Sequence, residues 1–212
     1  GDMIDLLVTG GTLVDGTGTA PRRADVAVED GRVTEIGDLA GRSAVHAIDV
    51  SGHVVAPGFV DVHTHSDLTL LSSPEAHSAV RQGVTTVVVG NCGLGVTPVG
   101  DSSHRAGTVR GGDAALQDHL DALRKAVGYL DLDPSVRWTW TDLPGYLAAL
   151  DTARPAVNVA VLVAHTPLRA AAVGFEDRPA DAAALDRMRR VLADALAAGA
   201  AGVSTGLVYA PV

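Results

Sequence analysis

The sequence contains few of the cysteines that cross-link small secreted proteins, and it lacks the long apolar segments that anchor proteins in membranes. Its 212 residues include one cysteine, Cys92, and only 3% are aromatic. A single cysteine excludes a disulfide scaffold and fits a reducing compartment, so we expect a cytoplasmic protein. No stretch approaches the roughly 18 consecutive apolar residues of a membrane span, and the first residues do not resemble a basic-then-apolar leader. We therefore expect no membrane partner.

Basic residues are also scarce. The chain has 25 acidic and 16 basic residues, which gives a net charge of −9, and Lys125 is the only lysine. This balance argues against a surface that binds nucleic acid. The hydrophobic share of 47% is that of a packed globular protein, and the length suits one large domain or slightly more.

Residues 1–56 are expected to form a small β region without helices. Turn residues repeatedly interrupt short apolar segments there. The strongest hairpin signal is Asp30-Gly31, which separates Asp25–Glu29 from Arg32–Ile36, because Asp-Gly suits the positive φ angles of a type I′ turn.

From residue 57 onward, strands are expected to alternate with helices. The expected strands are 59–63, 84–90, 157–164 and 200–204, and the expected helices are 74–81, 142–150 and 181–198. Segment 84–90 is almost continuously apolar and β-branched, which suits a parallel strand buried on both faces. Asp142 is the expected N-cap of its helix, whereas residues 98–118 resemble a long loop. The alternation predicts a parallel sheet with right-handed crossovers over residues 57–212.

Two histidines stand at the end of the first of these strands, in Asp61-Val62-His63-Thr64-His65. Alternate side chains of a strand share a face, so His63 and His65 are expected to point the same way and could chelate one metal ion. The C-terminal ends of parallel barrel strands carry the active-site loops. This context favours a metal site over a pair of surface or core histidines.

Two further candidates follow the next strands. Cys92 lies in Gly90-Asn91-Cys92-Gly93, on the same expected rim, where a thiolate could bind zinc. The alternative is a small buried apolar residue, which is the usual role of a lone cysteine. His165 ends the third strand, either as a pocket group or as a merely hydrogen-bonded histidine. The Ser204 segment lacks the Gly-x-Ser-x-Gly elbow, which argues against a serine hydrolase.

Together these residues resemble the amidohydrolase superfamily. Ala56-Pro57-Gly58-Phe59-Val60-Asp61-Val62-His63-Thr64-His65 matches its first-strand signature. Residues 83–93, 158–169 and 201–211 are similar to the N-acyl-D-amino-acid deacylase (D-aminoacylase) family, and the Asn-Cys-Gly motif at Cys92 narrows the resemblance to that family. The resemblance implies an α/β fold, a (β/α)8 TIM barrel preceded by a small β-sandwich-like region. Residues 1–56 would be that region and residues 57–212 the first four βα units of the barrel.

The same resemblance implies an enzyme that hydrolyses the amide bond of small-molecule N-acyl-D-amino acids with one or two zinc ions per complete site. His63 and His65 would share one metal position, Cys92 would be the thiolate ligand of the tightly held zinc or bridge to the other position, and Tyr209 would lie near the substrate. Many dinuclear amidohydrolases bridge their metals with a carboxylated lysine at the end of the fourth strand, and residues 200–204 contain no lysine. The alternatives are a dihydroorotase- or hydantoinase-like enzyme, against which these features argue, and a non-catalytic fragment.

No catalytic residue is assigned within the sequence. The resemblance places two more zinc-binding histidines on the fifth and sixth strands and the general-base aspartate on the eighth, all expected beyond Val212. We therefore expect the chain alone to be inactive and to bind zinc weakly. Because half a barrel leaves two open sheet edges, we also expect self-association or a missing C-terminal segment.

Overall fold

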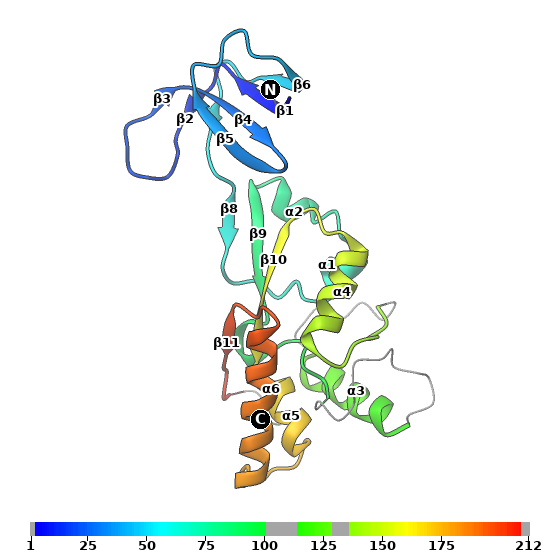
Figure 1. Cartoon of the computed structure of the whole chain (residues 1–212). Helices are drawn as coiled ribbons and strands as arrows, with labels where there is room; N and C mark the ends of the chain where they lie inside the picture. The colour runs from blue at the N-terminus through cyan, green and yellow to red at the C-terminus, as the bar shows by residue number, and fades with distance from the viewer. Residues whose placement is uncertain (1–2, 101–113, 129–135, 209–212) are drawn as a thin grey trace. The chain divides into compact units, whose positions relative to one another are not determined.

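A computed structural model describes residues 3–100, 114–128 and 136–208 (Figure 1). The chain divides into two compact units, Gly1–Gly58 and Phe59–Val212. The first unit contains β1 (Ile4–Thr9), β2 (Thr12–Leu13), β3 (Arg22–Arg23), β4 (Asp25–Glu29), β5 (Arg32–Gly37), β6 (Ala44–Asp49) and β7 (Val54–Val55). The second contains β8 (Phe59–Asp61), α1 (Thr69–Ser72), α2 (His77–Val80), β9 (Val84–Val89), the 3₁₀-helix η1 (Asn91–Gly93), α3 (Ala114–Ala126), α4 (Leu143–Ala153), β10 (Asn158–Ala164), α5 (His165–Val173), α6 (Ala182–Ala197) and β11 (Gly202–Ser204).

The first unit consists of two small sheets. One has the strand order β5-β4-β1-β6 and the other β3-β2-β7. The hairpin between β4 and β5 is confirmed: Asp30 and Gly31 have φ angles of 49° and 70°, both positive as a type I′ turn requires. The Asp25 carboxylate accepts hydrogen bonds from the backbone N–H groups of Gly10 and Leu39, at 2.8 and 3.1 Å, and so joins β4 to two loops.

The second unit contains a four-stranded sheet in the order β11-β10-β9-β8, and every neighbouring pair is parallel. The predicted parallel sheet is confirmed. Spatial order follows chain order, so the C-terminal ends of successive strands lie side by side. The predicted cap of α4 is also confirmed, because the Asp142 carboxylate accepts the Gly145 N–H at 2.9 Å. No helix in the three described ranges is long and apolar enough to cross a membrane.

Three expectations for this unit were wrong in detail. Strand β9 is not buried on both faces, since Val87 and Val89 are buried whereas Val84, Thr86 and Val88 on the other face are only half-buried. Helix α3 occupies part of the expected loop 98–118, the rest of which from residue 101 to 113 lies outside the described residues. Helix α5 was not predicted; it starts directly after β10, and most of its nine residues are buried.

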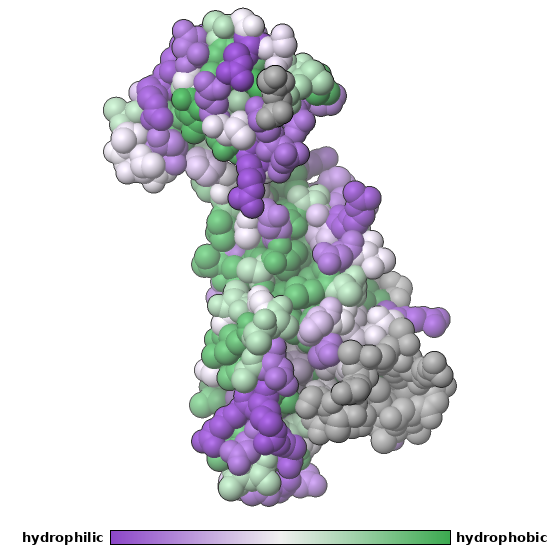
Figure 2. All heavy atoms as spheres, in the orientation of Figure 1, coloured by the Kyte–Doolittle hydropathy of each residue, from purple (hydrophilic) through white to green (hydrophobic). Residues whose placement is uncertain are grey.

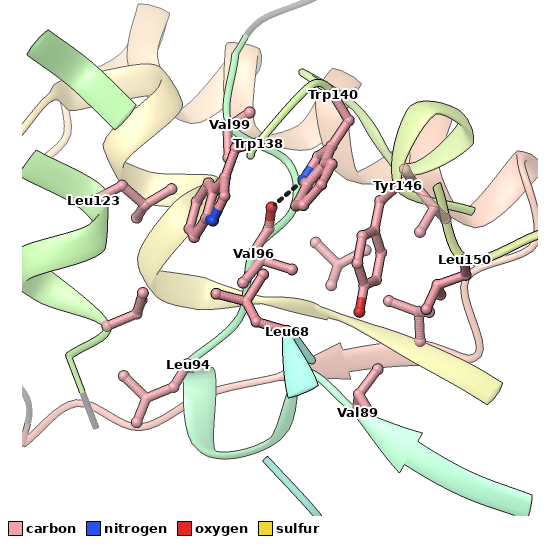
Figure 3. Close-up of a cluster of buried hydrophobic side chains, with 14 of the residues drawn as sticks. Leu68, Val89, Leu94, Val96, Val99, Leu123, Trp138, Trp140, Tyr146 and Leu150 are labelled. Atoms are coloured by element: carbon pink, nitrogen blue, oxygen red, sulfur yellow. Dashed lines mark hydrogen bonds between the residues drawn. The ribbon is translucent and has the colours of Figure 1, made fainter. Parts of the chain in front are cut away.

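The core of the second unit contains a cluster of three aromatic residues, although aromatic residues are scarce in the chain. The buried rings of Trp138 and Trp140 stack at 5.7 Å between centroids, and Trp140 lies 5.2 Å from Tyr146 (Figure 3). Trp140 Nε1 donates to the Val96 carbonyl at 2.7 Å, and the Tyr146 hydroxyl donates to the Asp67 carbonyl at 2.6 Å. The core therefore anchors the segments that follow β8 and η1.

Strand β8 and Val62 directly after it are exposed. The exposed fractions of Phe59, Val60 and Val62 are 65%, 56% and 68%. Figure 2 shows apolar surface over this part of the unit, around β8, β9 and β10. Self-association or coverage by a further segment stays a prediction.

Candidate metal centre

The structure brings together three side chains that the sequence singled out. The potential ligand atoms of His63, His65 and Cys92 all lie within 4.8 Å of one another. His63 Nε2 lies 3.1 Å from Cys92 Sγ, and the His63 and His65 rings meet edge to face at 5.5 Å between centroids. Among the described residues, no other histidine, cysteine, aspartate or glutamate side chains gather in such a group.

The two histidines converge for a different reason from the one predicted. Strand β8 ends at Asp61, whose carboxylate accepts the His63 backbone N–H at 3.1 Å, so both histidines belong to the loop that follows. Strand alternation therefore does not align them. Asp61 pairs with Val87 of parallel β9, and this register places the loop after β8 beside the turn that carries Cys92.

The Cys92 turn has an unusual backbone. Cys92 has φ 59° and ψ 18°, in the left-handed region that non-glycine residues seldom occupy. Gly90 and Gly93, with φ angles of 80° and 72°, are also left-handed, and a Cβ on Gly93 would lie 2.5 Å from the Gly206 backbone nitrogen. The turn therefore needs both glycines and holds Cys92 in a costly conformation, as is common at functional sites.

The protonation of His65 suits a ligand. Burial lowers the pKa of His65, because it disfavours the charged imidazolium, and the nearby His63 lowers that pKa further. Metal ions bind the neutral imidazole. His65 Nδ1 is buried and has no hydrogen-bond partner within the described part of the chain.

The donor set fits zinc. Two imidazole nitrogens and one thiolate are ligands that zinc takes, and catalytic zinc sites use three protein ligands and leave a position open for water or substrate. Lys125 lies exposed in α3, and β11 contains no lysine, so a lysine bridge at the end of the fourth strand is absent from the described residues. Cys92 is then the one potential anionic ligand in the group.

A buried carboxyl that was not singled out from the sequence lies beside this centre. Asp67, two residues after His65, is 1% exposed, and its Oδ2 has no hydrogen-bond partner among the described residues. Burial raises the pKa of Asp67 to about 7, although its own backbone N–H and that of Gly90 pull the value down. An acidic residue in a loop is usually exposed to solvent, so only the tertiary structure shows that Asp67 is buried.

The other candidates stand apart from the group of three ligands. His165 is the first residue of α5 rather than the last of the strand, and its Nδ1 is buried without a partner in the described ranges. Burial lowers the pKa of His165, and the nearby Arg169 lowers it further. Tyr209 lies outside the described residues. The Ser204 hydroxyl accepts a hydrogen bond from the Gly93 N–H of the Cys92 turn at 2.9 Å. This contact was missed because the sequence was searched only for a nucleophilic serine.

Replacing Gly93 with alanine is expected to lower the free energy of unfolding by about 2 kcal/mol more than replacing Gly83, because the new Cβ would press on the Gly206 backbone. Gly83 has a similar φ of 79°, but its Cβ would make only an ordinary contact with Phe59. Urea denaturation of both variants measures the difference. Equal losses would show that the turn can relax around the added methyl group.

Comparison with known proteins identifies relatives of the chain. The chain is 40% identical over 210 residues to an N-acyl-D-glutamate deacylase of Alcaligenes xylosoxydans xylosoxydans, which covers 99% of this chain and 38% of the relative. The crystal structure of the N-acyl-D-glutamate deacylase from Bordetella bronchiseptica, complexed with zinc and a phosphonate inhibitor, superposes with a TM-score of 0.80 at 43% identity. It covers 99% of this chain and 40% of that structure.

A structure of D-aminoacylase, from work on its binuclear metal centre, superposes with a TM-score of 0.77 at 40% identity over 98% of this chain and 40% of its own. The chain thus spans about two fifths of the length of these relatives. Its fold is mixed α/β, with a curled parallel half-barrel sheet and a β-rich unit. The sequence profile of the amidohydrolase family matches residues 46–212, and the chain therefore belongs to the amidohydrolase family.

Proposed function

We propose that this chain carries the metal-binding part of a zinc-dependent enzyme that hydrolyses the amide bond of N-acyl-D-amino acids. The observation that carries the proposal is the convergence of His63, His65 and Cys92. The substrate class comes from the relatives, which are deacylases of N-acylated D-amino acids. The half-barrel sheet would belong to the first four βα units of a (β/α)8 barrel. Residues Gly1–Gly58 would form the small β-sandwich-like region that precedes the barrel.

Each residue of the centre would have a defined task. A bound zinc ion acidifies water and polarises a carbonyl group. His63 and His65 would present neutral imidazole nitrogens, and Cys92 would supply the negative charge as a thiolate, so its thiol proton is released on binding. Asp61, through the His63 N–H, fixes the loop in which both histidines lie.

The general base would come from elsewhere. No described carboxylate joins the three ligands, and Asp67 is buried rather than open to a substrate. We propose that the aspartate that the resemblance places on the last barrel strand lies outside these 212 residues, together with two further histidine ligands. The chain alone is then expected to bind zinc only weakly and not to hydrolyse the substrate.

Replacing Cys92 with alanine is expected to weaken zinc binding by at least about 100-fold, since even the hydrogen-bond partners of zinc ligands contribute 10- to 100-fold. Competition with a chromophoric chelator measures the affinity in the purified chain. His77→Ala, in α2, is the matched control and should bind zinc as the original chain does. Equal zinc affinity of the Cys92→Ala variant and the original chain would refute the site.

The substrate class is tested by adding the missing part. A protein in which this chain continues into the further length found in the relatives should hydrolyse N-acetyl-D-glutamate or another N-acetyl-D-amino acid, and not the L-enantiomers. Chelation of zinc should abolish the reaction. Hydrolysis by the 212-residue chain alone, above the level of its Cys92→Ala variant, would contradict the proposed origin of the general base.

A further inference from the structure

One side chain from a distant strand braces both sides of the Cys92 turn. The Ser204 hydroxyl, on β11, donates a hydrogen bond to the Gly90 carbonyl and accepts one from the Gly93 N–H at 2.9 Å. Ser204 follows Gly90 by 114 positions and Gly93 by 111. A hydroxyl can donate and accept at the same time, so one side chain satisfies a backbone acceptor before Cys92 and a backbone donor after it.

The sheet order explains why β11 reaches this turn. Strand β11 pairs with β10, where Ser204 lies opposite Ala164, and not with β9. The turn after β9 crosses the end of β10 closely, since a Cβ on Gly90 would strike the Leu162 carbonyl. The turn therefore passes over the end of β10 and contacts Ser204 on β11, the next strand of the sheet.

A second polar side chain fixes the turn to the histidine loop. Asn91 is buried, and its Nδ2 donates to the Val88 carbonyl at 2.8 Å and to the Thr64 carbonyl at 3.3 Å. Thr64 stands between the two histidines in sequence. The amide thus joins the backbone next to Cys92 to the backbone between His63 and His65.

We propose that Ser204 is a positioning residue of the metal centre, which holds Cys92 in its left-handed conformation so that the thiol faces His63 and His65. Asn91 sets the separation of the two ligand-bearing segments. A left-handed conformation costs a non-glycine residue free energy, so an unbraced turn would tend to relax and move Sγ away from the imidazoles. That a metal ion binds here rests on the proposed function, whereas the bracing of the Cys92 turn by Ser204 does not.

The test compares Ser204→Ala with Ser204→Thr, which keeps the hydroxyl on a strand that accepts β-branched residues. Ser204→Ala is expected to weaken zinc binding about 10- to 100-fold and to reduce the thiolate-to-cobalt charge-transfer absorption of the Co²⁺-loaded chain. Ser204→Thr should restore both. Thr152→Ala removes an exposed hydroxyl of α4 that donates to the Ala148 carbonyl, and it should change neither.

A second readout needs no metal. In the metal-free chain, amide hydrogen exchange at Gly93 should become about tenfold faster in Ser204→Ala and return in Ser204→Thr, because the Gly93 N–H loses and then regains its acceptor. Unchanged exchange and zinc affinity in Ser204→Ala would overturn the assignment, and so would a loss that the threonine variant shares. If the original chain binds no zinc, the proposed function fails, and the Gly93 exchange still decides whether Ser204 braces the turn.

Discussion

Replacing Trp140 with alanine is expected to lower the free energy of unfolding of the Phe59–Val212 unit by about 3–5 kcal/mol, the range for a large aromatic residue lost from a core. Trp140 is 2% exposed, packs against Trp138 and Tyr146, and donates to the Val96 carbonyl. In Figure 3 its ring lies between the other two. Truncation would leave a cavity there and an unpaired carbonyl. Chemical denaturation followed by circular dichroism measures the loss.

Two variants separate the causes of that loss. Trp140→Phe keeps much of the ring packing but removes the N–H donor, so we expect a smaller loss than for alanine. Leu196→Ala truncates a residue of α6 that is 45% exposed and should cost well under 1 kcal/mol. A Trp140→Ala variant as stable as Leu196→Ala would show that the aromatic cluster does not hold this unit together.

Replacing Asp67 with asparagine is expected to remove a pH dependence of about 4 kcal/mol from the stability of the metal-free chain. Burial raises the pKa of Asp67 from 3.8 to about 7. Between these two values the unfolded chain has released the proton while the folded chain keeps it. The folded state therefore binds more protons, and this group makes stability fall as pH rises from about 4 to 7 and level off above.

Denaturant unfolding at several pH values from 4.5 to 8, in the presence of a chelator, measures the effect. The difference between the original chain and Asp67→Asn should grow in favour of the variant up to about pH 7 and then stay constant. Asp151→Asn, which removes an exposed carboxylate of α4, is the control for the loss of an acidic residue. A difference that does not vary with pH would show that Asp67 titrates alike in both states.

The sequence located the three residues of the candidate metal centre but not the reason that they meet. His63 and His65 were expected to align through strand alternation, yet β8 ends at Asp61 and both lie in the following loop. The two histidines still lie close to each other and to Cys92, because the parallel register of β8 and β9 brings the loop beside the Cys92 turn. A motif near the end of a strand can thus be located without knowledge of where the strand ends.

The features that could be predicted from the amino-acid sequence are local ones. The alternation of apolar strands with helices, the Asp30-Gly31 turn and the Asp142 cap depend on neighbours in the chain, so composition and spacing are enough to predict them. The tertiary structure decided which distant groups meet. The burial of Asp67 and the bracing of the Cys92 turn by Ser204 depend on contacts between residues far apart in the chain, because packing sets burial and strand order sets reach.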